Sequence, residues 1–125
     1  MAKKILLVDD DTTFLAVLGD WFTGKGFEVH KEQNGPSALE YLKKGKIDVI
    51  ILDFVMQPMN GIEVLEKIKG NTSTKHIPVF LLSQLGEGEH IAKARELGAE
   101  DYLVKSNFNL ESLTARINAI IENKS

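Results

Sequence analysis

Four short apolar runs are the feature of this sequence that most restricts what it can fold into. The runs cover residues 5–8, 49–52, 79–82 and 102–104. Each is too short for a helix, and they mostly lack the alternation of apolar and polar residues that marks a half-exposed strand. They are typical of strands buried on both faces, as in a parallel sheet. Residues 27–30 instead alternate apolar with polar residues, which predicts a fifth strand near a sheet edge.

Segments with helical periodicity separate these runs. Their apolar residues recur at the spacing of one helix face. The predicted helices cover residues 14–22, 36–44, 61–69, 89–97 and 110–121. Asp11 or Thr12 is suited to cap the first helix, and Asn34 or Ser37 the second. Strict alternation of strand and helix implies right-handed crossovers and helices on both faces, so we expect an α/β fold with a doubly wound five-stranded parallel sheet.

Length and composition exclude several classes of protein. The 125 residues fit a single domain over residues 1–125, and 43% hydrophobic with 26% charged residues is the balance of a soluble globular protein. The absence of cysteine excludes disulfides and thiolate metal sites and agrees with a cytoplasmic location. The apolar run at 5–8 is far shorter than a signal peptide or a membrane span, so we expect no membrane association. A net charge of −3 gives no electrostatic reason to bind nucleic acid directly.

Polar side chains follow directly after each of the four apolar runs. They are Asp9, Asp10 and Asp11 after the first run, Asp53 after the second, Ser83 after the third and Lys105 after the fourth. In a doubly wound sheet the ligand site lies at the carboxyl ends of the strands, so we expect these side chains to meet at one edge. Any one of them alone is equally well explained as a helix cap or a solvated loop end. Together, at strand ends where charge is costly to bury, they indicate a functional site.

Three clustered carboxylates repel one another and need a positive charge among them. Mg²⁺ prefers oxygen ligands and suits a site without histidine or cysteine. The three histidines, His30, His76 and His90, lie away from the ends of the runs and are interpreted as surface residues. An aspartate such as Asp53 can attack phosphorus and form an aspartyl phosphate, provided that Mg²⁺ and an ammonium group such as that of Lys105 neutralise the moving phosphoryl group.

The order and spacing of these motifs resemble the receiver domain of bacterial response regulators, the family of the single-domain chemotaxis regulator in two-component signalling. The resemblance spans residues 3–122 and implies a flavodoxin-like sheet with strand order 2-1-3-4-5. It implies a phosphoprotein and not an enzyme, one that takes a phosphoryl group from a sensor histidine kinase or a phosphotransfer domain with Mg²⁺ as cofactor. At most, such a domain phosphorylates and dephosphorylates itself. Its output passes to a downstream effector protein or domain.

The resemblance assigns the metal ligands residue by residue. Asp10 is expected to bind Mg²⁺ directly, and Asp9 largely through water. Asp53 is expected to be both the phosphoacceptor and a metal ligand. Val55 is expected to lend its main-chain carbonyl oxygen to the metal.

The resemblance also implies which residues bind the phosphoryl group and which residues form a conformational switch. Ser83 and Lys105 are expected to bind the phosphoryl oxygens beside Asp53. The Ser83 hydroxyl would then move towards the phosphoryl group, and Tyr102 would fill the vacated space. This change would alter the surface of the fourth helix, the fifth strand and the fifth helix. From the residues alone, Tyr102 is equally well explained as a half-buried strand aromatic with its hydroxyl in water.

Two positions depart from the family pattern. Ser106 follows Lys105 where the family usually has a cis-proline, and a cis bond before any other residue is costly. A trans peptide there is expected to shift Lys105 slightly. Gln57 stands where the acceptor loop usually has proline, and Pro58 comes one residue later, so the metal loop is expected to differ in shape.

Two further hypotheses concern kinetics and assembly. Val55 and Leu85 offer no polar group to orient a hydrolytic water, and Gln84 stands where the family often has a small residue, so we expect slow self-dephosphorylation. Asp101 and Arg116 occupy places where related transcription factors form ion pairs between subunits. We therefore expect a monomer or a weak dimer promoted by phosphorylation.

Other functions stay open from the sequence. The main alternative is a receiver-like docking module that acts independently of phosphorylation, which the departures at Gln57 and Ser106 allow. A magnesium phosphohydrolase would need a second aspartate as general acid where Val55 stands. A flavodoxin-type cofactor binder would need a phosphate loop rich in serine, threonine and glycine after the first strand, and the sequence has none there.

Overall fold

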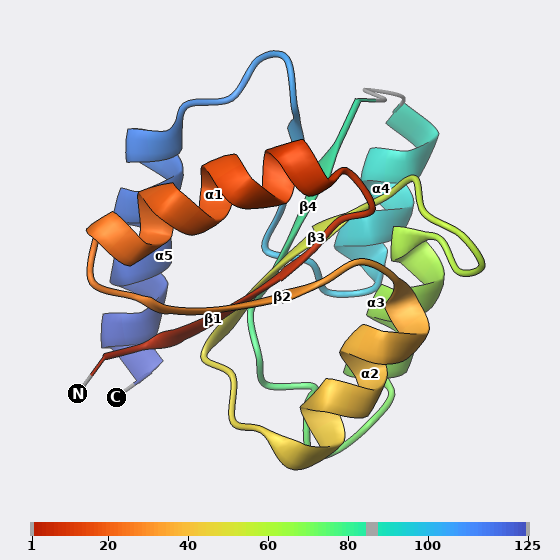
Figure 1. The fold of residues 1–125 in the computed structure, drawn as a ribbon. Coiled ribbons are helices and arrows are strands. Elements are labelled where there is room, and N and C mark those ends of the chain that lie inside the picture. Colours follow the sequence, from red (N-terminus) through yellow and green to blue (C-terminus); the bar gives the residue numbers. More distant parts are fainter. Residues whose placement is uncertain (1, 85–87, 125) are drawn as a thin grey trace.

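The computed structural model of the protein describes residues 2–84 and 88–124 (Figure 1). Within these residues, strands and helices alternate as β1 (Lys4–Val8), α1 (Thr12–Gly24), β2 (Glu28–Glu32), α2 (Gly35–Lys44), β3 (Val49–Asp53), α3 (Gly61–Lys69), β4 (Val79–Ser83), α4 (Gly88–Glu96), β5 (Asp101–Val104) and α5 (Leu110–Lys124). Neighbouring strands pair in parallel in the order β2-β1-β3-β4-β5, which confirms the doubly wound sheet. No helix in this part of the chain has the length and apolar character needed to cross a membrane.

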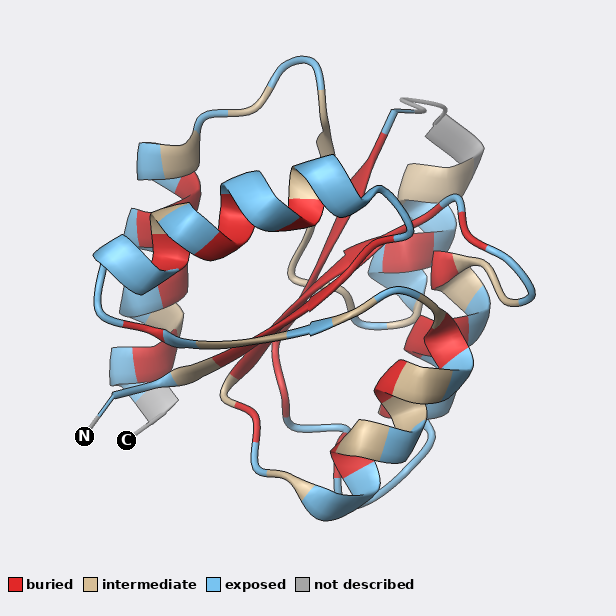
Figure 2. Cartoon of the chain, in the orientation of Figure 1, coloured by how far each residue is buried: buried red, intermediate tan, exposed pale blue. Residues whose placement is uncertain are grey.

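Buried side chains form two apolar layers, one on each face of the sheet. Because side chains alternate along a strand, Leu6 and Ile50 belong to the layer under α2 and α3, whereas Ile5 and Val49 belong to the layer under α1 and α5. Figure 1 shows α1 and α5 on one side of the sheet and α2, α3 and α4 on the other. Figure 2 shows the buried residues along the central strands and on the inward faces of the helices. This double cover explains why the central strands read as continuous apolar runs.

The edge strand is displaced from its predicted position. It runs from Glu28 to Glu32 instead of 27–30, and its residues are exposed or half-buried, as expected at a sheet edge. Phe27 instead turns into the core, where its ring packs edge-to-face against Phe22 with centroids 5.4 Å apart. The burial of Phe27 therefore belongs to the turn after α1 and not to the strand.

Side-chain caps fix the starts of the first two helices. Asp11 and not Thr12 caps α1, because the Asp11 carboxylate accepts from backbone N–H groups of the first turn, including that of Phe14 at 3.1 Å. Asn34 and not Ser37 caps α2, since the Asn34 side chain accepts from the Ser37 N–H at 2.9 Å. The Asp11 cap sets the direction in which α1 leaves the carboxyl end of β1.

Candidate functional site

The sheet order brings the predicted polar residues to one edge. Asp53 and Ser83 are the last residues of the neighbouring strands β3 and β4. Asp9 directly follows β1, and Lys105 directly follows β5. The backbone N–H of Lys105 donates to the carbonyl oxygen of Ser83 at 2.7 Å, which continues the strand pairing to this edge. The four positions therefore lie side by side at the carboxyl ends of parallel strands.

Asp9, Asp10 and Asp53 form an acidic cluster at this edge. One carboxylate oxygen from each lies within 4.8 Å of the oxygens of the other two. Asp9 and Asp53 are buried, with 3% and 4% of their surface exposed, whereas Asp10 is exposed. The cluster is therefore open to solvent on the side of Asp10. The carboxylate of Asp11 serves instead as the cap of α1.

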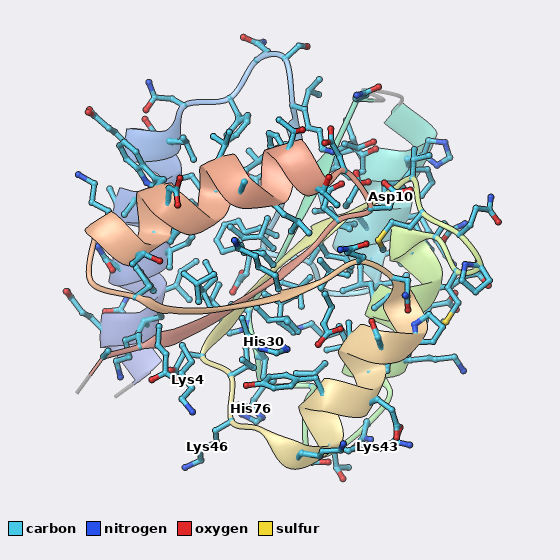
Figure 3. All side chains as sticks on the ribbon, in the orientation of Figure 1. Lys4, Asp10, His30, Lys43, Lys46 and His76 are labelled. Carbon is cyan, nitrogen blue, oxygen red and sulfur yellow. The ribbon has the colours of Figure 1, made fainter. Side chains whose placement is uncertain are left out.

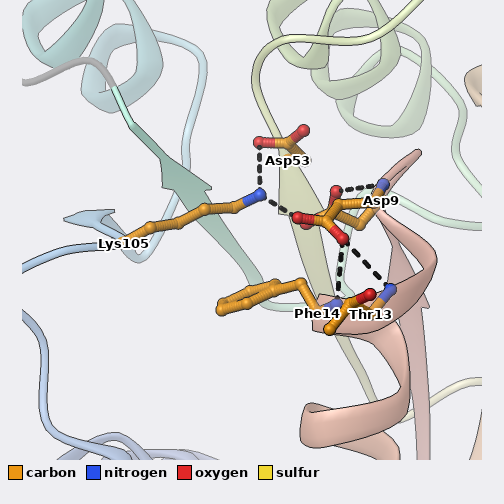
Figure 4. A network of polar contacts seen from close by, with 6 residues as sticks. Asp9, Thr13, Phe14, Asp53 and Lys105 are labelled. Atoms are coloured by element: carbon orange, nitrogen blue, oxygen red, sulfur yellow. Dashed lines mark hydrogen bonds and ion pairs between the residues drawn. The ribbon is translucent and has the colours of Figure 1, made fainter.

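Lys105 reaches into the acidic cluster (Figure 4). Its Nζ lies 2.7 Å from Oδ2 of Asp9 and 3.5 Å from Oδ1 of Asp53, and only 11% of its side chain is exposed. Burial by itself lowers the pKa of Lys105, but the hydrogen bond with Asp9 and the charges of Asp53 and Asp9 outweigh burial and raise this pKa above its ordinary value. The ammonium is thus held in its charged form between two carboxylates.

The peptide bond after Lys105 is trans. Among the described residues, the only cis peptide bond is Gln57–Pro58. Despite the serine at position 106, Lys105 keeps contact with both Asp9 and Asp53. The departure from the family pattern after Lys105 therefore leaves the lysine within reach of the cluster.

An open cavity of about 440 Å³ adjoins the cluster. It is lined by Asp10, Asp11, Asp53, Val55, Gln84 and Lys105. Val55 is 51% exposed at this rim. Leu85 lies outside the described residues, so slow self-dephosphorylation stays a prediction. The cavity gives a small anion a path from solvent to the carboxylate of Asp53.

The charge of Asp53 is only partly balanced within the cluster. Burial and the negative charge of Asp9 raise the pKa of the Asp53 carboxyl from 3.8 to about 7, although Lys105 acts in the opposite direction. One ammonium group does not compensate three carboxylates, so a further positive charge would favour ionised Asp53. The ionised form is the one that can act as a nucleophile.

We expect Asp53→Asn to stabilise the protein in EDTA by about 2 kcal/mol above pH 7. The pKa of Asp53 in the fold is about 7, above the ordinary value of 3.8, so its proton contributes stability fully below the ordinary value, and this contribution is lost as pH rises through 7. Asparagine has no proton to lose, so the advantage of the variant should shrink towards about pH 4. Urea unfolding followed by the fluorescence of Trp21, the single tryptophan, measures the difference.

The exposed Asp20 on α1 supplies the matched control for this prediction. Asp20→Asn should change the free energy of unfolding little and without the same pH dependence. An Asp53→Asn difference that stays constant from pH 4 to pH 9 would contradict the account.

Ser83 and Tyr102 are both buried near the site. Ser83 is 0% exposed at the end of β4. Tyr102 is 6% exposed and belongs to the apolar layer that also contains Ala94 of α4. Tyr102 is therefore not the half-buried aromatic that the residues alone allowed. Its inward position connects β5 with α4.

The histidines do not belong to the acidic cluster. Among the described residues, the group of side chains able to hold a metal is Asp9, Asp10 and Asp53. His30 stacks on Tyr41 with ring centroids 3.6 Å apart and contacts Glu32 at 2.6 Å. Figure 3 shows His30 and His76 well away from Asp10.

The third histidine, His90, lies next to the residue that follows Asp53. The ring of His90 on α4 lies 4.4 Å from the ring of Phe54, which follows Asp53. His76 is exposed, and His30 and His90 are half-buried, so the surface interpretation holds fully only for His76.

Sequence reasoning missed two contacts that shape the site. The N–H of Gly61 donates to the carbonyl of Phe54 at 2.7 Å, and a Cβ on Gly61 would lie 2.5 Å from the carbonyl oxygen of Asp53. The Phe14 ring lies under the Lys105 ammonium, with Nζ 4.5 Å from the ring centroid. In the sequence Gly61 marks a helix start and belongs to the acceptor loop that resembles the family, and Phe14 marks the apolar face of a helix; neither contact is visible there.

Asp101 and Arg116 form an ion pair with each other within the chain. Arg116 also donates to the carbonyl oxygen of Glu100 at 3.0 Å. The pair joins β5 to α5, on the surface expected to switch. A dimer that used these two residues between subunits would have to break this contact, so the weak dimer stays a hypothesis.

Comparison with known families gives a match over most of the chain. The family model of the response regulator receiver domain covers residues 5–118. The chain belongs to this family. As a receiver domain of two-component signalling, it is a signalling domain and not a classical enzyme.

The receiver domain matches almost the whole length of some relatives and about half of others. Chemotaxis protein CheY-3 of Vibrio cholerae is 33% identical over 120 residues, which are 95% of this chain and 92% of the relative. The probable transcriptional regulatory protein SilR of Salmonella typhimurium is 36% identical over 118 residues, which are 94% of this chain but 50% of the relative. The receiver domain of the Francisella response regulator 1452 superimposes with a TM-score of 0.90 at 27% identity, covering 98% and 99% of the two chains. The flavodoxin-like receiver fold is thereby confirmed.

Proposed function

We propose that the receiver domain, residues 1–125, takes a phosphoryl group onto Asp53 from a sensor histidine kinase or a phosphotransfer domain. The observation that carries this proposal is the position of Asp53, whose Oδ1 lies 3.5 Å from the Lys105 ammonium beside a solvent-open cavity of about 440 Å³. A nucleophilic carboxylate, a buried cation and access for an anion are the parts that phosphoryl transfer to aspartate requires.

Mg²⁺ fits the donor set of the acidic cluster. The available ligands are carboxylate oxygens on one exposed and two buried aspartates, and one ammonium leaves their charge unbalanced. In this proposal Asp10 and Asp53 would hold the ion directly, Asp9 would act through water, and Val55 would lend its main-chain carbonyl oxygen. When bound, the ion supplies positive charge that stabilises the phosphoryl oxygens during transfer.

Asp53, Lys105 and Ser83 have different roles in the transfer. A carboxylate oxygen of Asp53 forms the new bond to phosphorus while the bond from phosphorus to the donor histidine nitrogen breaks, and the imidazole leaves with the electron pair. Lys105 pairs with one phosphoryl oxygen, and the Ser83 hydroxyl donates a hydrogen bond to another. The neighbouring ends of β3, β4 and β5 support this assignment.

The output of this proposal is a change at the surface of α4, β5 and α5. Movement of the Ser83 hydroxyl towards the phosphoryl group gives buried Tyr102 a new position at the contact between β5 and α4. A downstream effector protein or domain in the cytoplasm would bind one of the two surfaces better than the other. Direct binding to nucleic acid or to a membrane is not part of this proposal.

Intact-mass measurement after exposure to acetyl phosphate and Mg²⁺ tests the proposal. The wild-type domain should gain the mass of one phosphoryl group, and Asp53→Asn or added EDTA should prevent the gain. The alternative, a docking module independent of phosphorylation, requires no gain in the wild type. Because Lys105 keeps its contacts with Asp9 and Asp53, the serine at position 106 no longer favours that alternative.

A further inference from the structure

Phe14 contacts the Lys105 ammonium but has no part in the function proposed above. The Nζ of Lys105 lies 4.5 Å from the centroid of the Phe14 ring. The face of an aromatic ring attracts a cation, and the attraction is stronger where water is excluded. With 11% of the Lys105 side chain exposed, this contact is largely shielded from solvent. Phe14 therefore gives the ammonium a favourable surface opposite the carboxylates.

Hydrogen bonds that begin at Asp9 in the acidic cluster hold the backbone of Phe14. Oδ1 of Asp9 accepts the N–H of Asp11 at 2.9 Å, and Oδ1 of Asp11 accepts the N–H of Phe14 at 3.1 Å. Oδ2 of Asp9 meets the Lys105 ammonium at 2.7 Å. Together with the contact between the Phe14 phenyl group and the ammonium, these interactions form a closed cycle of contacts through Asp9, Asp11, Phe14 and Lys105 (Figure 4). The backbone of Phe14 is thus connected through Asp11 and Asp9 to the Lys105 ammonium.

Phe108, in the loop between β5 and α5, packs against the Phe14 ring. The two rings meet edge-to-face, with centroids 6.3 Å apart and an interplanar angle of 65°. Phe108 lies between β5 and α5, in the loop that begins at Lys105. The backbone of this loop is held as well, since the N–H of Asn107 donates to the carbonyl oxygen of Val104 at 2.9 Å. The paired rings join the loop to the first turn of α1.

We propose that Phe14 is a positioning residue that holds the Lys105 ammonium between Asp9 and Asp53. A lysine side chain is long and flexible, and a change of its rotamer would move the ammonium away from Asp53. The Phe14 ring opposes this shift by giving the cation a fixed place. The inference rests on the proposed function, since the position of Lys105 affects signalling only if Asp53 takes a phosphoryl group.

A double-mutant cycle on stability tests the contact without phosphoryl transfer. Phe14→Leu, Lys105→Met and the double variant are unfolded in urea with EDTA. We expect a coupling of about tenfold in the unfolding equilibrium constant, or about 1.4 kcal/mol, whereas Phe14→Leu and the exposed Lys67→Met should be additive. Additivity of Phe14→Leu with Lys105→Met overturns the proposal. Lys105→Gln replaces Lys105→Met if the latter does not fold.

Rates of phosphorylation by acetyl phosphate with Mg²⁺ test the positioning role. Phe14→Leu should lower the rate about fivefold, Phe14→Tyr should stay within about twofold because it keeps the ring, and Phe14→Leu should have no further effect in the Lys105→Met background. Equal losses in Phe14→Leu and Phe14→Tyr, or an undiminished loss without Lys105, overturn the role. A coupled stability cycle in a wild type that gains no phosphoryl group supports the contact and refutes the proposed function.

Discussion

Lys105→Met should lower the rate at which Asp53 takes a phosphoryl group by about a hundredfold to a thousandfold. Methionine keeps most of the apolar stem of lysine but removes the charge that lies 2.7 Å from Asp9 and 3.5 Å from Asp53. Without this charge, the phosphoryl oxygen next to the acceptor would lose the ammonium group that neutralises it. A time course of intact mass with acetyl phosphate and Mg²⁺ measures the rate.

Lys46→Met is the matched control for this substitution. Lys46 is exposed in the loop between α2 and β3, and Figure 3 shows it far from Asp10. Its loss removes the same charge from the protein without touching the site, so the rate should stay within about twofold. A Lys105→Met rate as high as that of Lys46→Met would contradict the role of the ammonium.

Gly61→Ala should lower the free energy of unfolding by about 3 kcal/mol and slow phosphorylation of Asp53 as well. A Cβ at this position would lie 2.5 Å from the carbonyl oxygen of Asp53 and 2.8 Å from the Cα of Phe54. Both neighbours are backbone atoms, which cannot relieve the close contact by changing rotamer as a side chain can. The start of α3 or the end of β3 must therefore move, and the acceptor moves with it.

Gly24→Ala tests whether this effect is specific to the site. Gly24 is the last residue of α1, and a Cβ there would have no neighbour within 4 Å. Alanine should leave the stability unchanged or raise it slightly, because it restricts the unfolded chain more than glycine does. Urea unfolding followed by circular dichroism compares the two variants. Similar losses in both would show that close approach at Gly61 is not the cause.

The sequence predicts the strands and their order along the chain because the sheet is covered on both faces. A central strand such as β3 must then be apolar throughout, and this pattern is visible without any tertiary information. The edge strand was less well predicted, since Phe27 is apolar for a reason outside the strand, its contact with Phe22. Local pattern alone does not reveal which neighbour buries a residue.

The sequence also predicts the acidic cluster, but it does not predict the contact between Phe14 and Lys105 that supports the cluster. Asp9, Asp53 and Lys105 stand at ends of parallel strands, so the sheet order alone brings them together. The contact between Phe14 and Lys105 depends on the direction of one side chain from a helix and one from a loop. The sequence offers no period or spacing that would reveal such a contact, and Asp11 reads like a member of the cluster although it caps α1.

Mapping the phosphoryl group to a residue tests whether Asp53 is the phosphoacceptor. After treatment with acetyl phosphate and Mg²⁺, borohydride reduction converts an aspartyl phosphate to homoserine, which peptide mass spectrometry locates in the sequence. We expect homoserine at position 53 in the wild type and at no other position. Homoserine at position 9 or 10, a phosphoryl group on a histidine or a hydroxyl, or an unmodified protein would contradict this assignment.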